Sequence, residues 1–289
     1  MKKHVISFAL LLGFVLSGRA QVSVEIVLEQ EQFLIGEAIP AAVRITNRSG
    51  QTLRLGDESN WLSFTLETRD GLAVVKNGEV PVKGEFQLES GKMATRRVDL
   101  APYFALNRYG RYQLHASVHI KEWDATLSAK PRSFDLIKGA KLWSQEFGMF
   151  LPPGVTNRVP EVRRYSLEQA NYLRTQLRLY VRITDVDDTH VIKVLPVGPM
   201  VSVSHPERQI DRVNNLHLLY QVGARTYLYA VITPDGEMIQ RQTHEITTTR
   251  PRLLADDKGN QSVVGGARRF SNDDLPGPPE TESHVSQEK

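Results

Sequence analysis

The sequence contains no cysteine among its 289 residues. Disulfide bonds, cysteine-ligated zinc and a cysteine nucleophile are therefore excluded. An excess of one charge is also absent. Lys and Arg number 36 against 33 Asp and Glu, and residues 1–20 hold three of the bases (Lys2, Lys3 and Arg19) and no acid. Without that segment 33 bases (36 less 3) face 33 acids, so general attraction to nucleic acid or an anionic membrane is not expected.

Long hydrophobic runs are scarce as well. The stretch Val5–Leu16 has 12 residues without a charge, which is ~18 Å of helix against a hydrocarbon core of ~30 Å. Lys2 and Lys3 precede it, and small residues, Gly18 and Ala20, follow it. This pattern predicts a secretory signal peptide over residues 1–20, cleaved after Ala20. An uncleaved anchor is the alternative.

No later segment is apolar enough to cross a membrane. The richest, Val194–Val203, is interrupted by Pro196 and Pro199. We therefore expect a mature chain without a transmembrane segment, exported to the periplasm or outside the cell. Export would permit disulfides, but the chain has none. The stability of the mature protein must therefore come from a large hydrophobic core.

Residues 21–138 show apolar side chains at every second position, separated by turn residues. This spacing predicts an antiparallel β-sandwich with one solvated face on each sheet. The alternating positions are Val22, Val24, Ile26 and Leu28; Ile39, Ala41, Val43 and Ile45; Leu62, Phe64 and Leu66; Phe86 and Leu88; Tyr112, Leu114, Ala116, Val118 and Ile120; and Phe134 and Leu136.

Two local patterns refine this prediction. Phe33-x-x-Gly36-Glu37 leads into a strand that ends at Asn47. Gly110-x-Tyr112 opens the longest strand, which is typical of a tyrosine corner, where the Tyr hydroxyl ties a strand start to the preceding loop.

With the turns at Asp70-Gly71 and Ser90-Gly91, these motifs resemble bacterial Ig-like domains of the intracellular proteinase inhibitor and macroglobulin-module types. The resemblance covers residues 21–138 and implies an Ig-like sandwich. It does not carry over inhibitory activity, because no inhibitory loop can be matched residue by residue and the leader departs from an intracellular protein.

Residues 139–267 predict a second antiparallel, β-rich domain. Leu173 to Thr184 alternates throughout, which favours a strand. For residues 161–171 a strand and a short helix both remain open, because Ser166-x-x-Gln169 imitates a capping box. Further strands are expected at about 189–195, 200–204, 215–222, 226–233 and 237–244. The fifth of these segments follows a hairpin turn, and the segment 226–233 is apolar on both faces, as in a central strand covered on both sides.

A weak internal repeat runs through the end of this domain. Pro206, Asp211, Asn215 and Leu218 recur 45 residues later as Pro251, Asp256, Asn260 and Val263. The period is that of a propeller blade. Only about two copies fit, so a closed propeller cannot form within one chain, and two similar hairpins in one open sheet are favoured. Residues 268–289 are rich in proline and acids and are expected to be a disordered tail.

No catalytic residue, cofactor or metal site is assigned from the sequence. His115 and His119 on one strand would be ~13 Å apart, too far to share a metal. Asp185, Asp187 and Asp188 form an acidic cluster. An EF-hand loop would need Gly and Glu where His190 and Pro196 stand, so an acidic hairpin turn is favoured and a bound cation stays an alternative.

The most distinctive surface feature is a stripe of Arg174, Arg178 and Arg182 with Tyr180 between them. Arg and Tyr are frequent at interaction hot spots, and three arginines at this spacing would span ~26 Å of strand. The stripe is the candidate partner surface, for a protein or an acidic polymer of the envelope. Structural pairing with Glu or Asp on neighbouring strands is the competing interpretation, and it is favoured because such cross-strand pairs are common.

The sequence thus predicts an exported, non-enzymatic all-β protein that serves as a binding or scaffold module in the cell envelope or outside the cell. Two alternatives remain. A protease inhibitor follows from the resemblance of the first domain, and a glycan-binding or glycan-acting protein from the repeat and the aromatic residues. A glycan-acting enzyme would need two carboxylates across a pocket.

Overall fold

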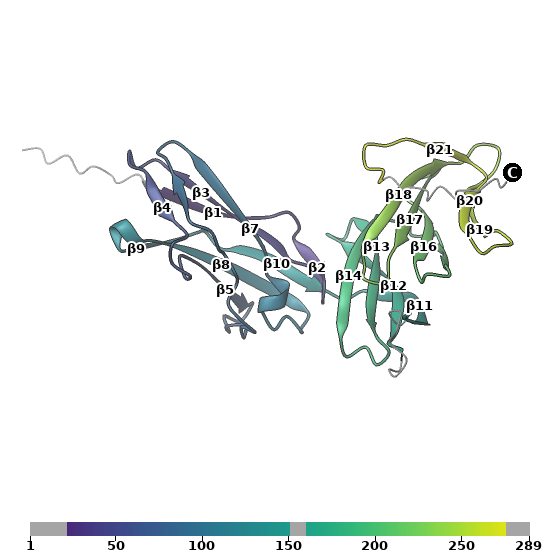
Figure 1. Ribbon diagram of the computed structural model, residues 1–289, viewed down its shortest axis with the longest axis horizontal. Coiled ribbons are helices and arrows are strands. Elements are labelled where there is room, and N and C mark those ends of the chain that lie inside the picture. The colour runs from purple at the N-terminus through teal and green to yellow at the C-terminus, as the bar shows by residue number, and fades with distance from the viewer. Residues whose placement is uncertain (1–21, 151–159, 276–289) are drawn as a thin grey trace, which may run out of the picture.

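The structure is a computed structural model that describes residues 22–150 and 160–275. It is all-β, as predicted, with mainly antiparallel sheets, and the described residues include two short 3-10 turns, η1 (Ala101–Tyr103) and η2 (Lys121–Trp123). Within the described ranges no helix has the length and hydropathy to cross a membrane. The predicted signal peptide, residues 1–20, lies outside the described residues. Figure 1 shows two β-rich lobes side by side along the long axis.

The first domain is a sandwich of two main sheets. One has the order β1-β3-β7, and the other has the order β2-β10-β8-β5 with β9 beside β8. Its strands are β1 (Val22–Leu28), β2 (Gln32–Leu34), β3 (Pro40–Asn47), β4 (Leu53–Leu55), β5 (Leu62–Thr68), β6 (Phe86–Leu88), β7 (Met93–Asp99), β8 (Gly110–Ile120), β9 (Ala125–Ser128) and β10 (Arg132–Ile137). The pair β2–β10 is parallel, and the other pairs are antiparallel.

The alternating residues form one core between these sheets. Side chains such as Val43, Phe64, Leu114 and Phe134 are at most 1% exposed. Period 2 places every second residue on the inner face, which is why the sequence revealed β1, β3, β5, β6, β8 and β10. It did not reveal β7, an edge strand whose residues are exposed or half-buried.

The tyrosine corner has the expected hydrogen bond. The Tyr112 hydroxyl donates to the Arg108 carbonyl oxygen at 2.7 Å. At the other end of the sandwich, the buried Asn47 amide donates to the carbonyl oxygens of Gln51 and Leu88 at 2.7 and 2.8 Å. These bonds fix loops to strand ends, so they stabilise the positions of the turns rather than the sheets themselves.

The second domain begins with a four-stranded sheet, β11-β12-β13-β14, and continues with a five-stranded sheet, β15-β16-β17-β18-β21. A two-stranded hairpin, β19-β20, lies beside β15 and β16. The strands are β11 (Ala140–Gly148), β12 (Val162–Tyr172), β13 (Gln176–Asp185), β14 (Val191–Pro199), β15 (Glu207–Ile210), β16 (Leu216–Gln221), β17 (Thr226–Ile232), β18 (Met238–Glu245), β19 (Arg252–Ala255), β20 (Gln261–Val264) and β21 (Ala267–Arg269).

The open question at residues 161–171 is decided in favour of a strand. β12 pairs with β13 from Arg163–Asp185 to Tyr172–Gln176. The predicted strand from Leu173 starts later than expected, at Gln176. Leu173 and Arg174 have φ of 49° and 61°, left-handed values that end one strand and turn the chain into the next.

β17 is covered on both faces, as its sequence indicates. Leu228, Ala230 and Ile232 belong to the core shared by the two sheets. Tyr227, Tyr229 and Val231 belong to a smaller cluster with Leu253 on the opposite face. The strand expected at 200–204 is not present. β14 instead continues to Pro199, and the chain then turns. The strand can contain prolines because it lies at the edge of its sheet, where a missing N–H donor leaves no partner unsatisfied.

The first residues of the expected disordered tail are ordered, which corrects the prediction for residues 268–275. Arg268 and Arg269 belong to β21, which pairs with β18, and Leu275 bridges to Arg241. Their backbone groups are bound to a sheet edge, so their polar composition did not decide their structure. Residues 276–289 lie outside the described residues.

Candidate functional site

The predicted arginine stripe divides between a turn and the junction of the two domains. Arg174 is exposed in the hairpin turn between β12 and β13. Arg178, Tyr180 and Arg182 lie on one face of β13, and that face packs against the first domain. Tyr180 is 0% exposed and the two arginines are half-buried.

Both arginines bind the segment around β2 of the first domain. Arg178 donates from Nη1 to Gln30 Oε1 at 3.0 Å, and its guanidinium stacks 3.5 Å over the Tyr172 ring. Arg182 donates from Nη1 to the Ile35 carbonyl oxygen at 2.9 Å. In both hydrogen bonds a charged guanidinium group donates to a neutral oxygen. These two arginines of the stripe therefore help to attach one domain to the other.

The junction also has a closely packed apolar part. Gly36 has φ of +89°, and a Cβ added there would lie 2.8 Å from Val191 Cγ1. Glu37 bridges to Val194 on the edge of β14, where Figure 1 shows β2 closest to the second domain. The buried members of the cluster are Leu34, Ala170, Tyr180 and Val194, and Ile137 and Val191 pack on them. Close backbone approach and apolar burial together indicate a fixed arrangement.

A buried carboxyl group lies at the centre of this junction. Glu37 is 2% exposed, and its Oε2 accepts a hydrogen bond from the Leu34 N–H at 2.8 Å. Burial raises the pKa of Glu37 to about 7, while the Leu34 N–H and the Arg178 charge oppose that rise. In the described part of the chain, Glu37 Oε1 has no hydrogen-bond partner.

The neighbouring Tyr180 hydroxyl is also buried without a hydrogen bond in the described residues. Burial, and then the Glu37 carboxylate, raise the pKa of Tyr180 to about 12. A buried polar group without a partner costs ~1–3 kcal/mol. The junction therefore includes a pair of unfavourable polar groups that the surrounding contacts offset.

Two neighbouring cavities beside the junction share part of their lining. One of about 700 Å³ is lined by both domains, and one of about 740 Å³ lies at the end of the first domain. Tyr109 and Ile137 line both, and Tyr109 is 57% exposed. Each is within the ~300–1,000 Å³ typical of ligand sites. We call the two cavities together the groove.

The groove is lined by charged side chains from several segments. Its cations are Arg69, Arg108, Arg111, Lys138, Lys141 and Arg182, and its carboxylates are Asp70, Asp135, Glu168 and Asp188. Two pairs neutralise one another: Arg111 with Asp135 at 2.9 Å and Arg182 with Asp188 at 3.3 Å. Hydrogen bonding to Arg111 lowers the pKa of Asp135, so this pair stays ionised.

Glu168 lies in the wall of the interdomain cavity. Burial raises the pKa of Glu168, while Arg182 and Lys141 oppose that rise. Gly139 leaves the space that its carboxylate occupies, because a Cβ at Gly139 would lie 2.6 Å from Glu168 Oε2. Glu168 and Asp188 thus share one cavity, a juxtaposition that the sequence did not reveal.

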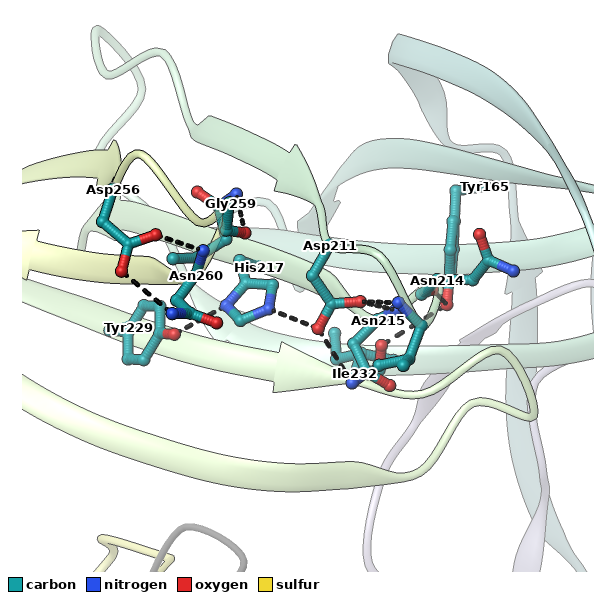
Figure 2. A network of polar contacts seen from close by, with 12 residues as sticks. Tyr165, Asp211, Asn214, Asn215, His217, Tyr229, Ile232, Asp256, Gly259 and Asn260 are labelled. Carbon is teal, nitrogen blue, oxygen red and sulfur yellow. Dashed lines mark hydrogen bonds and ion pairs between the residues drawn. The ribbon is translucent and has the colours of Figure 1, made fainter. Parts of the chain in front are cut away.

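A second polar cluster lies at the turn between β15 and β16 (Figure 2). His217 Nδ1 is 2.7 Å from the Tyr229 hydroxyl, and His217 Nε2 is 3.0 Å from Asp211 Oδ2. Burial, and then Asp211, raise the pKa of Tyr229 to about 12. Asp211 also accepts hydrogen bonds from the Asn215 N–H and side-chain amide, at 2.8 and 3.0 Å.

The same turn recurs at Asp256, which explains the 45-residue repeat. Asp256 accepts from the Asn260 N–H at 2.7 Å and from its side-chain amide at 2.9 Å. Asn214 and Gly259, with φ of 67° and 80°, occupy the equivalent left-handed position. Figure 2 shows both turns. The repeat is therefore two similar hairpins closed by one Asx-turn type, and the cluster at His217 fixes the first of them.

The acidic cluster at residues 185–190 is also a hairpin turn. Asp185 accepts hydrogen bonds from the N–H groups of Thr189 and His190, at 2.8 and 3.1 Å. The hydrogen bond from the Thr189 hydroxyl, and then these backbone bonds, lower the pKa of Asp185. Asp188 turns to Arg182. Among the described residues no three His, Asp or Glu side chains are grouped so as to hold a metal ion.

Comparisons with known proteins add little to this description. No family model matches the chain, and no curated protein matches its sequence. One of the solved structures that resemble it is Spo0M, a sporulation control protein from Bacillus subtilis. It has a TM-score of 0.30 and 10% identity, and the match covers 70% of this chain and 79% of that one. At this level the likeness says nothing about function.

Sequence reasoning found the β13 arginines but not the groove beside them. Tyr109, Lys138 and Lys141 stand singly in the sequence, in a loop, a linker and an edge strand. Only the Gly110-x-Tyr112 motif, directly after Tyr109, indicated that this loop is fixed.

Proposed function

We propose that this chain is an exported binding module of the cell envelope or the extracellular space, and that its ligand binds in the groove. The observation that carries the proposal is the interdomain cavity, which both domains line and which the Arg178 and Arg182 contacts hold in place. Ligands usually bind in preformed concavities where a few polar side chains converge beside apolar ones.

Export is supported by residues 1–20. The charged start, the 12-residue apolar stretch and the small residues at Gly18 and Ala20 fit a cleaved leader. Expression of the full chain in a bacterial host, followed by fractionation and N-terminal sequencing, tests this. We expect a soluble exported chain beginning at Gln21. Recovery of the uncleaved chain in the membrane fraction contradicts it.

The groove is tested with immobilised envelope components: cell-wall sacculi, lipopolysaccharide and solubilised envelope proteins. We expect the mature protein to be retained by at least one of them, and Tyr109→Ala and Lys141→Glu to be released. Lys92→Glu is the matched control, because Lys92 is an exposed lysine in the turn before β7 and does not line the groove. Equal retention of groove and control variants overturns the assignment of the site.

A further inference from the structure

Four cations of the groove are not in ion pairs within the described part of the chain: Arg69, Arg108, Lys138 and Lys141. Arg69 comes from the turn after β5, Arg108 from the loop before β8, Lys138 from the linker and Lys141 from β11. Three regions that are far apart in the sequence, around residues 69, 108 and 138–141, thus bring positive charge to the groove. Charged residues that were merely scattered over a solvated surface would not gather in this way.

The local charge differs from that of the whole chain. The groove has six cations and four carboxylates, whereas residues 21–289 have equal numbers of each. The pairs Arg111–Asp135 and Arg182–Asp188 leave four other cations facing two other carboxylates, Asp70 and Glu168, so the excess positive charge lies on these four cations. A ligand of complementary charge is an anion.

The groove also has features that a simple anion site does not need. Tyr109, which lines both cavities, is 57% exposed, and an exposed phenol ring offers an apolar face with a polar edge. Gln169 and Asn171 line the interdomain cavity and supply amide donors and acceptors. A sugar ring has an apolar C–H face and hydroxyl groups at its rim, which matches this combination.

We infer that the groove binds an anionic polysaccharide, with one carboxylated or sulfated sugar in each cavity and the chain crossing Tyr109. This rests on the proposed function and names its ligand class. The volumes of about 700 and 740 Å³ accommodate a sugar residue each with its hydration. Arg69 and Arg108 bind the charged group in the first-domain cavity, and Lys138 and Lys141 bind the one in the interdomain cavity.

Titration calorimetry with four tetramers of defined chemistry tests the inference: tetragalacturonate, a sulfated chondroitin tetrasaccharide, neutral maltotetraose and tetraglutamate. We expect the mature protein to bind at least one anionic saccharide, and to bind maltotetraose and tetraglutamate at least about 10-fold more weakly. Affinity for the anionic saccharide should fall when salt rises to physiological strength, because the Debye length shortens to ~8 Å.

Variants separate this inference from the proposed function. Lys138→Glu/Lys141→Glu should weaken binding of the anionic saccharide by about 10-fold. Tyr109→Ala should also weaken this binding, whereas Lys92→Glu should leave it unchanged. Preference for tetraglutamate, or equal binding of maltotetraose, overturns the inference and leaves the groove as a binding site. Saccharide binding that none of the groove variants reduces overturns the proposed groove itself.

Discussion

The two domains contribute different material to the junction between them. The first domain presents a turn and its backbone: the Ile35 carbonyl group, Gly36 and the buried Glu37. The second domain presents the side chains of one strand face, Arg178 and Arg182 among them. The turn can be approached closely because Gly36 has no side chain, whereas the strand reaches across with long, charged side chains.

Strand β13 shows why this difference was hidden in the sequence. Leu179 and Tyr180 are neighbours and both 0% exposed, yet Leu179 lies in the second domain's own core and Tyr180 lies in the junction. Alternation in a sequence reports that a strand has two different faces. It does not report whether the polar face meets water or another domain.

The largest effect is expected from substitutions that alter each face of β13 on its own. Tyr180→Ala should lower the stability of the junction by ~3–5 kcal/mol, as truncation of a buried aromatic does. Leu179→Ala should lower the stability of the second domain by ~2–5 kcal/mol. Tyr180→Ala should loosen the junction and leave the second domain's unfolding transition in place, whereas Leu179→Ala should lower that transition. Calorimetric unfolding with a separate probe for each domain measures this. Identical effects of both variants on one transition contradict the distinction.

Gly36 tests the close approach from the other side of the junction. Gly36→Ala should cost about 2 kcal/mol, because it adds left-handed strain and places a Cβ 2.8 Å from Val191 Cγ1. Gly50→Ala is the matched control, since Gly50 has φ of +81° and nothing within 4 Å of the added Cβ. Chemical denaturation of both variants gives the difference, and equal losses would show that the approach to Val191 does not matter.

The arginines of the stripe are expected to separate into two classes. Arg178→Gln/Arg182→Gln should cost about 1.5 kcal/mol, because charge-assisted hydrogen bonds to Gln30 and the Ile35 carbonyl oxygen are lost. Arg174→Gln, in the exposed turn, should change stability by less than about 0.5 kcal/mol. Denaturation midpoints measure both. A larger loss of stability for Arg174→Gln than for the double variant would contradict this division of the stripe into two classes.

A smaller effect than that of the double arginine variant is expected from Glu37, as a dependence of stability on pH. Its folded-state pKa of about 7 lies above the ordinary value of 4.5, so its contribution is present in full below pH 4.5 and is lost as pH rises through 7. Arg178 on β13 is the cation that faces it, and Leu34 on β2 supplies the N–H. From pH 6 to 8 the loss should be on the order of 1 kcal/mol. Glu37→Gln should remove this dependence in unfolding measured across that range, and an unchanged slope contradicts it.

Much of the fold was predictable because its signals are local. Period-2 alternation gave β1, β3, β5 and β8, and a run that is apolar on both faces gave β17. The Gly110-x-Tyr112 motif gave the hydrogen bond to Arg108. β7 and β21 escaped notice, since edge strands need no alternating apolar residues.

The groove was not predictable, for a different reason. Its lining comes from the ends of strands in two domains, and which ends meet depends on the junction. Tyr109, Lys138 and Glu168 each look ordinary in their own segment. The repeat at Asp211 and Asp256 was visible in the sequence, but only the shared hydrogen bonds identify it as a turn.

The fixed arrangement of the two domains is the claim on which the groove depends, and the absence of cysteine makes it directly measurable. Ser63 on β5 and Ser144 on β11 are exposed serines in different domains. Spin labels on Ser63→Cys/Ser144→Cys would report the distance between the domains by pulsed electron paramagnetic resonance. We predict a single narrow distance distribution that broadens when Arg178→Gln/Arg182→Gln is added. A broad distribution in the chain without those changes would show that the domains move independently and would contradict the account.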